Sequence, residues 1–267
     1  MQSVNAYNDV GIYVEFFSDT KIQEIANDKI IISDELIFPK EIVVAARSLD
    51  EFYLYENKIR EKIDKNIIVR YWPILNKEEG YWISFDSDTK ALERIFNEIK
   101  ERENNDKLYV MIDFENPIQK VGGYNFDENK RLIYDLIENK DIYNLNISIV
   151  QNTKVSVLGM KKKDYFSNYD IENVKMFYSS FHTRYFLGNL FSKYLLKKEI
   201  KRGLKYDGNY VIALGCLDIG IQGNEPLITK DRLRYDLSIA KKNNLRKVML
   251  FGYSMEYKEV IKDYVFS

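Results

Sequence analysis

The stretch LYVMIDFENP, residues 108–117, is an apolar run that ends in two acidic residues. Near-continuous apolar runs of this length are typical of strands buried on both faces, as in parallel sheets covered by helices. Strand side chains alternate between faces, so Asp113 and Glu115 share a face with Met111. Pro117 has no backbone N–H to donate and ends the strand. The run therefore predicts a buried parallel strand whose end presents two carboxyl groups together.

The rest of the chain repeats this pattern. Eight short apolar runs alternate with longer segments, several of helical period, as in β-α units with a parallel sheet. The predicted strands are residues 11–17, 41–47, 66–72, 107–115, 145–151, 173–179, 210–217 and 246–251. Eight such units predict an α/β fold, a single (β/α)8 TIM barrel with outer helices. An open doubly wound sheet is the alternative, but residues 16–20 lack the G-x-G-x-x-G turn that binds dinucleotides.

Helices are clearest at residues 89–102 and 230–243, where apolar residues follow an i, i+3, i+4 spacing. Residues 184–202 predict a third amphipathic helix. Residues 29–40 predict a strand or hairpin outside the regular count. Residues 154–170 are polar and predict a loop or a short helix.

The length and composition of the chain limit the number of domains and the classes of partner that we expect. The 267 residues match the usual size of one barrel and contain no Pro-, Gly- or Ser-rich linker, so we expect one domain over 1–267. No apolar run reaches the length of a membrane span, and no secretory signal opens the chain, so we expect a cytoplasmic protein without a membrane partner. A net charge of −1 predicts no nucleic-acid partner.

The single cysteine, Cys216, and the single histidine, His182, leave no internal disulfide, thiolate cluster or multi-histidine metal site. We therefore expect no metal site and no cofactor. The chemistry of this chain is predicted to rest on carboxylates, tyrosines and arginines.

In a TIM barrel the carboxyl ends of the strands carry the site. Asp113 and Glu115 lie at such an end, and carboxyl groups this close can have their pKa values pushed apart. Flat aromatic rings suit the apolar faces of sugars, although aromatic packing of a loop explains them equally well. The other candidates for ligand contact at strand ends or in the loops beyond them are Glu15, Arg70, Tyr71, Trp72, Trp82, Tyr178, Asp218 and Tyr253.

Together with the eight-unit pattern, Asp113-x-Glu115 resembles the end of the D-x-x-D-x-D-x-E motif of family 18 chitinase-like glycoside hydrolases. Residues 174–179 are similar to that family's M-x-Y-D strand, with Ser179 in place of the last Asp. The resemblance implies that Glu115 protonates the leaving oxygen. It implies that Asp113 orients an N-acetyl group of the substrate, which acts as the nucleophile, with assistance from Tyr178.

Three functions follow as hypotheses. The first is hydrolysis of a glycan by the Asp113–Glu115 pair. The second is a carbohydrate-binding or scaffold barrel without catalysis, because Leu108 and Met111 stand where the motif has its first two acids. The third is a phosphate-ester hydrolase in which Asp113, Glu115 and Glu15 hold Mg²⁺, which prefers hard oxygen ligands. The expected partner is a carbohydrate or another small polar ligand, and the sequence leaves the oligomeric state open.

Overall fold

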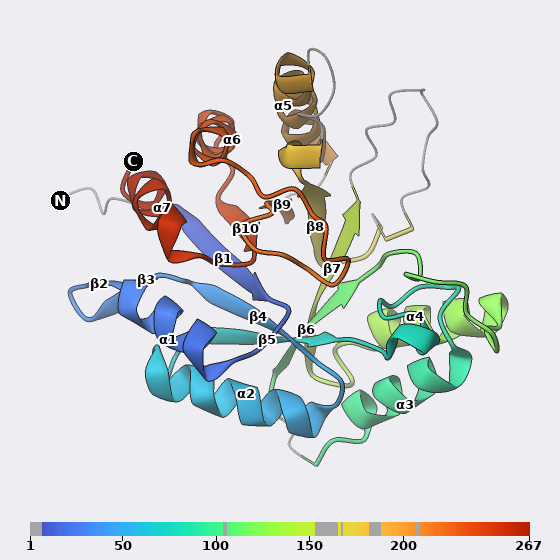
Figure 1. The fold of residues 1–267 in the computed structure, drawn as a ribbon. Helices are drawn as coiled ribbons and strands as arrows, with labels where there is room; N and C mark the ends of the chain where they lie inside the picture. The colour runs from blue at the N-terminus through green and yellow to red at the C-terminus, as the bar shows by residue number, and fades with distance from the viewer. Residues whose placement is uncertain (1–6, 104–105, 153–164, 167, 182–187, 207–208) are drawn as a thin grey trace.

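The computed structural model describes residues 7–103, 106–152, 165–166, 168–181, 188–206 and 209–267. Within them, eight parallel strands close a barrel (Figure 1). In barrel order they are β1 (Asp9–Val14), β4 (Glu41–Ala46), β5 (Ile68–Pro73), β6 (Leu108–Asp113), β7 (Leu145–Asn152), β8 (Glu172–Phe177), β9 (Tyr210–Leu214) and β10 (Lys247–Phe251). Pairing of β1 with both β4 and β10 closes the ring. The predicted (β/α)8 barrel is confirmed.

Helices surround this barrel (Figure 1). They are α1 (Asp19–Asp28), α2 (Leu49–Lys62), α3 (Thr89–Lys100), α4 (Phe126–Glu138), α5 (Gly188–Tyr206), α6 (Lys230–Lys242) and α7 (Lys258–Val265). The predicted helices at 89–102 and 230–243 are confirmed as α3 and α6. Each begins after a side-chain cap, because Asp88 accepts a hydrogen bond from the backbone of Ala91 and Thr229 accepts one from that of Arg232. Of the third predicted helix, residues 184–187 lie outside the described part.

The segment at 29–40 is a hairpin beside the barrel. Its strands β2 (Ile30–Ile32) and β3 (Glu35–Phe38) pair antiparallel. Ser33 and Asp34 both adopt positive φ, as a tight hairpin turn requires. Most of segment 154–170 lies outside the described residues, so its expected loop is not described. Among the described helices, none combines the length and the apolar character needed to cross a bilayer.

The interior of the barrel holds a buried ion network near the amino ends of the strands. Arg70 Nε donates to Glu41 Oε1 at 2.7 Å, and Lys247 Nζ donates to Glu41 Oε2 at 2.6 Å and to Glu172 Oε2 at 2.8 Å. Burial opposes ionisation of Glu41, but the two cations outweigh it and lower its pKa to about 2. The negative charges of Glu41 and Glu172 thus balance the positive charges of Arg70 and Lys247.

This network corrects two sequence-based placements. Arg70 points into the barrel but lies below its mouth, because β5 runs three residues further, to Pro73. Tyr71 has the opposite orientation and packs its ring 5.1 Å from Phe52 of α2. Since both side chains are enclosed by the fold, neither is a candidate for ligand contact at the mouth.

Replacing Glu41 with Gln is expected to lower the free energy of unfolding at pH 7 by about 3 to 5 kcal/mol, because the positive charge of Arg70 stays buried without its closest partner. The pKa of Glu41 is depressed, so its contribution is present above pH 4.5 and is lost as the pH falls through about 2. Urea denaturation measures both effects. In the control variant Glu35→Gln, loss of the exposed pair with Lys40 should cost less than about 1 kcal/mol. Equal costs in the two variants would contradict this assignment.

Candidate active site

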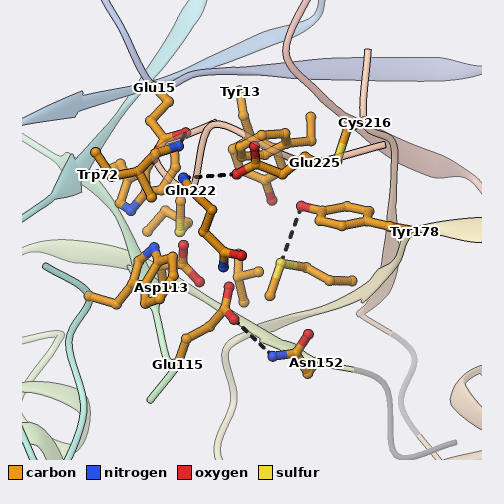
Figure 2. A pocket seen from close by; sticks show the side chains of 16 residues that line it. Tyr13, Glu15, Trp72, Asp113, Glu115, Asn152, Tyr178, Cys216, Gln222 and Glu225 are labelled. Carbon is orange, nitrogen blue, oxygen red and sulfur yellow. Dashed lines mark hydrogen bonds between the residues drawn. The ribbon is translucent and has the colours of Figure 1, made fainter. Parts of the chain in front are cut away.

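A cavity of about 450 Å³ opens at the carboxyl ends of the barrel strands (Figure 2). This is the end of a TIM barrel at which active sites are built. Its walls combine carboxyl groups, aromatic rings and thioethers. The lining residues are Tyr13, Glu15, Trp72, Trp82, Met111, Asp113, Glu115, Val150, Asn152, Met176, Tyr178, Cys216, Ile221, Gln222, Glu225 and Phe251.

Asp113 and Glu115 form a carboxyl pair on one side of this cavity. Asp113 is the last residue of β6 and is 5% exposed, whereas Glu115 lies two residues beyond the strand and is less buried. The amide of Asn152, the last residue of β7, donates to Glu115 Oε2 at 2.9 Å. Side-chain alternation along the extended chain turns both acids to the same face.

The surroundings of the pair favour its protonated form. Burial raises the pKa of Asp113 well above its ordinary value, and the negative charges of Glu115 and Glu15 and a hydrogen bond with Glu115 raise it further. Because the two groups interact strongly, they titrate as a unit that keeps a proton where isolated carboxylic acids have lost theirs. A proton-sharing carboxyl pair of this kind can act as a general acid.

Glu15 lies across the cavity from Glu115 (Figure 2). It is the residue after β1, and it accepts hydrogen bonds from the Tyr81 hydroxyl at 2.8 Å and the Ile221 backbone N–H at 3.1 Å. Burial raises the pKa of Glu15 to about 7 in spite of these two donors. A carboxyl group on each side of the cavity is thus tuned to titrate outside its ordinary range.

Replacing Glu15 with Gln should change how stability depends on pH. The folded protein binds a proton at Glu15 up to a pKa of about 7, whereas the unfolded chain releases it near 4.5. The wild-type protein therefore loses stability over this interval, by about 3 kcal/mol, and the variant does not. Denaturation at pH 4.5, 7 and 9 measures the free energy of unfolding of both proteins. The value for the variant relative to the wild type should rise between pH 4.5 and 7 and should stay nearly constant between pH 7 and 9. A difference independent of pH would contradict the assignment.

Aromatic rings form the deeper wall. Trp72, the inward residue near the end of β5, packs against Tyr13 with ring centroids 6.0 Å apart. Tyr178, one residue beyond β8, packs 5.6 Å from Phe251, and its hydroxyl donates to Met176 Sδ at 3.2 Å. Burial raises the pKa of Tyr178 well above its ordinary value, so its hydroxyl stays protonated and available as a donor.

Six of the sequence-predicted residues meet in this cavity, and they come from several different strand ends. Asp218 and Tyr253 lie outside it, beside a smaller hollow of about 270 Å³. The Lys21 ammonium donates to Asp218 at 2.8 Å, and the Tyr253 hydroxyl donates to Asp28 at 2.7 Å. Both side chains have structural partners there, which removes them, with Arg70 and Tyr71, from the main site. The six that line the cavity are Glu15, Trp72, Trp82, Asp113, Glu115 and Tyr178.

Ten of the sixteen lining residues were missed by sequence reasoning, and four of these ten carry a hydroxyl, amide or carboxyl group. Tyr13 shares the inward face of β1 with Glu15, so alternation alone could have found it. Asn152 lies one residue beyond the predicted end of its strand. Gln222 and Glu225 belong to the long loop after β9, where no periodic pattern places a side chain.

The described residues contain no group of three or more His, Cys, Asp or Glu side chains placed to hold a metal ion. Asp113, Glu115 and Glu15, which the magnesium-dependent alternative requires as ligands, therefore do not form a metal site in the structure.

No protein-family model and no curated protein matches this sequence. Solved glycoside hydrolases share its fold. Active domain 2 of the chitinase from Pyrococcus furiosus superposes with a TM-score of 0.54 at 9% identity, covering 97% of each chain. The glycoside hydrolase domain of PgaB (BpsB) from Bordetella bronchiseptica gives 0.56 at 8% identity, covering 97% of this chain and 99% of that one. A tri-modular GH5 endo-β-1,4-glucanase from Bacillus licheniformis gives 0.56 at 11%, covering 98% and 60%. At these identities the likeness establishes the barrel and nothing finer.

Proposed function

We propose that this protein is a glycoside hydrolase in which Glu115 is the general acid and Asp113 tunes it. The observation that carries the proposal is the proton-holding Asp113–Glu115 pair in an aromatic-walled cavity at the carboxyl end of the barrel. The glycoside hydrolases among the structural neighbours, one of them solved with chito-oligosaccharides, support a carbohydrate ligand.

In this mechanism a sugar ring lies against Trp72 or Trp82, whose faces match the apolar C–H surface of the ring. Glu115, the more exposed acid of the pair, delivers the shared proton to the glycosidic oxygen as the bond to the anomeric carbon breaks. Asp113 supplies the hydrogen bond that keeps the proton in the pair until then. The Tyr178 hydroxyl, which stays protonated, donates to a substrate oxygen.

Two groups can complete the reaction. The resemblance to family 18 implies attack by an N-acetyl group of the substrate, which retains the anomeric configuration. Glu15, on the opposite side of the cavity and ionised above its pKa of about 7, can instead take a proton from an attacking water, which inverts it. NMR of the freshly released anomer separates the two routes.

Release of reducing ends from a panel of neutral, N-acetylated and amino oligosaccharides tests the proposed function. Hydrolysis that is lost in Glu115→Gln supports it. Binding without any product would favour the alternative of a carbohydrate-binding barrel without catalysis.

A further inference from the structure

The outer faces of α5 and α6 are rich in basic residues. These two helices pack against each other outside the barrel (Figure 1). Among their described charged side chains that are exposed, eight are basic and one, Asp231, is acidic. The whole chain has a net charge of −1, so this excess of positive charge is local. The eight basic residues are Lys197, Lys198, Lys201 and Lys205 on α5 and Lys230, Arg234, Lys241 and Lys242 on α6.

The other acids of the two helices are buried and have partners inside the fold. Glu199 is 2% exposed and accepts a hydrogen bond from Arg202 at 3.0 Å. Asp236 is completely buried and pairs with Arg232 at 2.9 Å. In contrast, the exposed lysines at positions 197, 198 and 201 form no ion pair with any residue that the structure describes. Their positive charge is therefore available to a partner from outside.

The exposed residues of α5 form one stripe along the helix. Residues 190, 194, 197, 201 and 205 follow each other at spacings of three and four, which places them on the same face. At 1.5 Å per residue the stripe is about 22 Å long. Its first turn is apolar, because Leu190 is 66% exposed and Tyr194 is 60% exposed. The stripe thus begins with two large solvent-exposed rings or chains and continues with lysines.

The apolar turn of α5 extends toward α6. Phe191, next to Leu190, is also exposed. The Lys193 ammonium lies 4.0 Å from the centroid of the Tyr235 ring, which is exposed on α6. This contact joins the two helices into one surface that combines apolar side chains with positive charge.

This combination fits a bilayer of anionic lipids. Leu, Phe and Tyr side chains insert between lipid headgroups, and lysines beside them attract the negative lipid surface. All four exposed cations of α5 are lysines, which act as point charges and suit a diffuse negative surface. Fixed carboxylate or phosphate groups of a protein or nucleic acid are more often bound by the planar fork of arginine, and lysine is depleted in protein interfaces.

We propose that the outer face of α5 and α6 binds the surface of an anionic phospholipid bilayer. The first turn of α5 inserts its apolar side chains, and the lysines that follow lie over the headgroups. This inference is independent of the proposed glycoside hydrolase activity. It differs from the sequence-based expectation of no membrane partner, because net charge and spanning segments do not reveal how a fold gathers lysines on one face.

Co-sedimentation of the full chain with vesicles tests the proposal without any glycan. The probes are vesicles of phosphatidylcholine alone and of phosphatidylcholine with phosphatidylglycerol at a ratio of 7:3. We expect binding to the anionic vesicles to be at least about tenfold tighter than to the neutral ones at 50 mM NaCl. Raising NaCl to 500 mM should remove most of this binding, because salt screens the attraction.

Two double variants separate the α5 surface from the total charge of the protein. Lys197→Gln combined with Lys201→Gln should weaken binding to the anionic vesicles about tenfold. Lys90→Gln combined with Lys130→Gln removes the same charge from exposed positions on α3 and α4 and should leave binding within twofold of the wild type. Equal losses in the two double variants, or no binding of the wild type to the anionic vesicles, would overturn the inference.

The apolar turn distinguishes a bilayer from an acidic macromolecule. Leu190→Ser keeps every charge and should weaken vesicle binding at least about threefold, because less apolar surface is inserted. Polyglutamate and a single-stranded RNA, each at the charge concentration of the vesicles, are expected to bind more weakly than the vesicles do. Tighter binding of either polymer would assign the surface to an acidic protein or to a nucleic acid, and vesicle binding unchanged in Leu190→Ser would rule out insertion. Each of these results would overturn the proposal and leave the proposed hydrolase activity untouched.

Discussion

Glu115→Gln is expected to lower kcat for glycan hydrolysis by about 10³-fold, within the range that general acid catalysis contributes. The amide has the size of the carboxyl group, and its oxygen can still accept the hydrogen bond from Asn152. It has no proton of suitable acidity to give to the leaving oxygen. Substrate affinity should therefore change little, because the lost interaction acts mainly in the transition state. Steady-state kinetics combined with direct binding measurements separates the two quantities.

The matched control is Glu128→Gln. Glu128 lies on α4, does not line the cavity and pairs with Arg131 on the surface. This variant should hydrolyse at the wild-type rate. If Glu115→Gln retained kcat within a factor of two, the protonating group would have to be another residue, and the assigned role of Glu115 would be wrong.

Asp113→Asn is expected to lower kcat by about 10²-fold at pH 7 while making the folded protein more stable at that pH. Asn can donate a hydrogen bond to Glu115, but it cannot share a titrating proton, so the pair loses the proton that the raised pKa of Asp113 favours. The raised pKa of Asp113 is also a cost to the folded state once the pH exceeds its ordinary value, and the amide removes that cost. A loss of activity together with a gain in stability indicates a carboxyl group whose burial serves function at a cost to the stability of the folded protein.

The pH profile gives a second measurement for this variant. The alkaline limb of kcat reports loss of the shared proton, and it should move to lower pH in Asp113→Asn. A purely structural role would lower stability and leave the limb in place. That combination would contradict the assignment of Asp113 as the residue that holds the proton.

Much of the fold follows from periodicity in the sequence. Buried parallel strands are apolar on both faces, so the run around Met111 and its seven counterparts stand out from helices with a single apolar stripe. The same reasoning found Asp113 and Glu115, because a strand end and side-chain alternation fix where two nearby acids point.

The sequence pattern could not predict how deep in the barrel an inward-facing side chain lies. Arg70 and Trp72 share the inward face of β5, yet Trp72 lines the cavity and Arg70 lies in the ion network below it. Alternation tells which face a residue takes, whereas the stagger between neighbouring strands sets its height. Contacts between distant residues also could not be predicted. Asp218 pairs with Lys21 outside the cavity, and no local sequence pattern indicates that contact.

The positions of loop residues could not be predicted from the sequence for a different reason. Gln222 and Glu225 enter the cavity from the loop that follows β9, where the backbone is irregular. Their placement depends on tertiary contacts such as the hydrogen bond from the Ile221 backbone to Glu15. The part of the cavity wall that Gln222 and Glu225 form is therefore visible only in the folded structure.

The most direct test of the account is a time course of reducing-end release from an oligosaccharide panel by the wild-type protein and by Glu115→Gln at equal concentration. The account predicts linear release from at least one glycan by the wild type, and release about 10³-fold slower by the variant. Equal release by both proteins, or no release from any glycan that the wild-type protein binds, would contradict it.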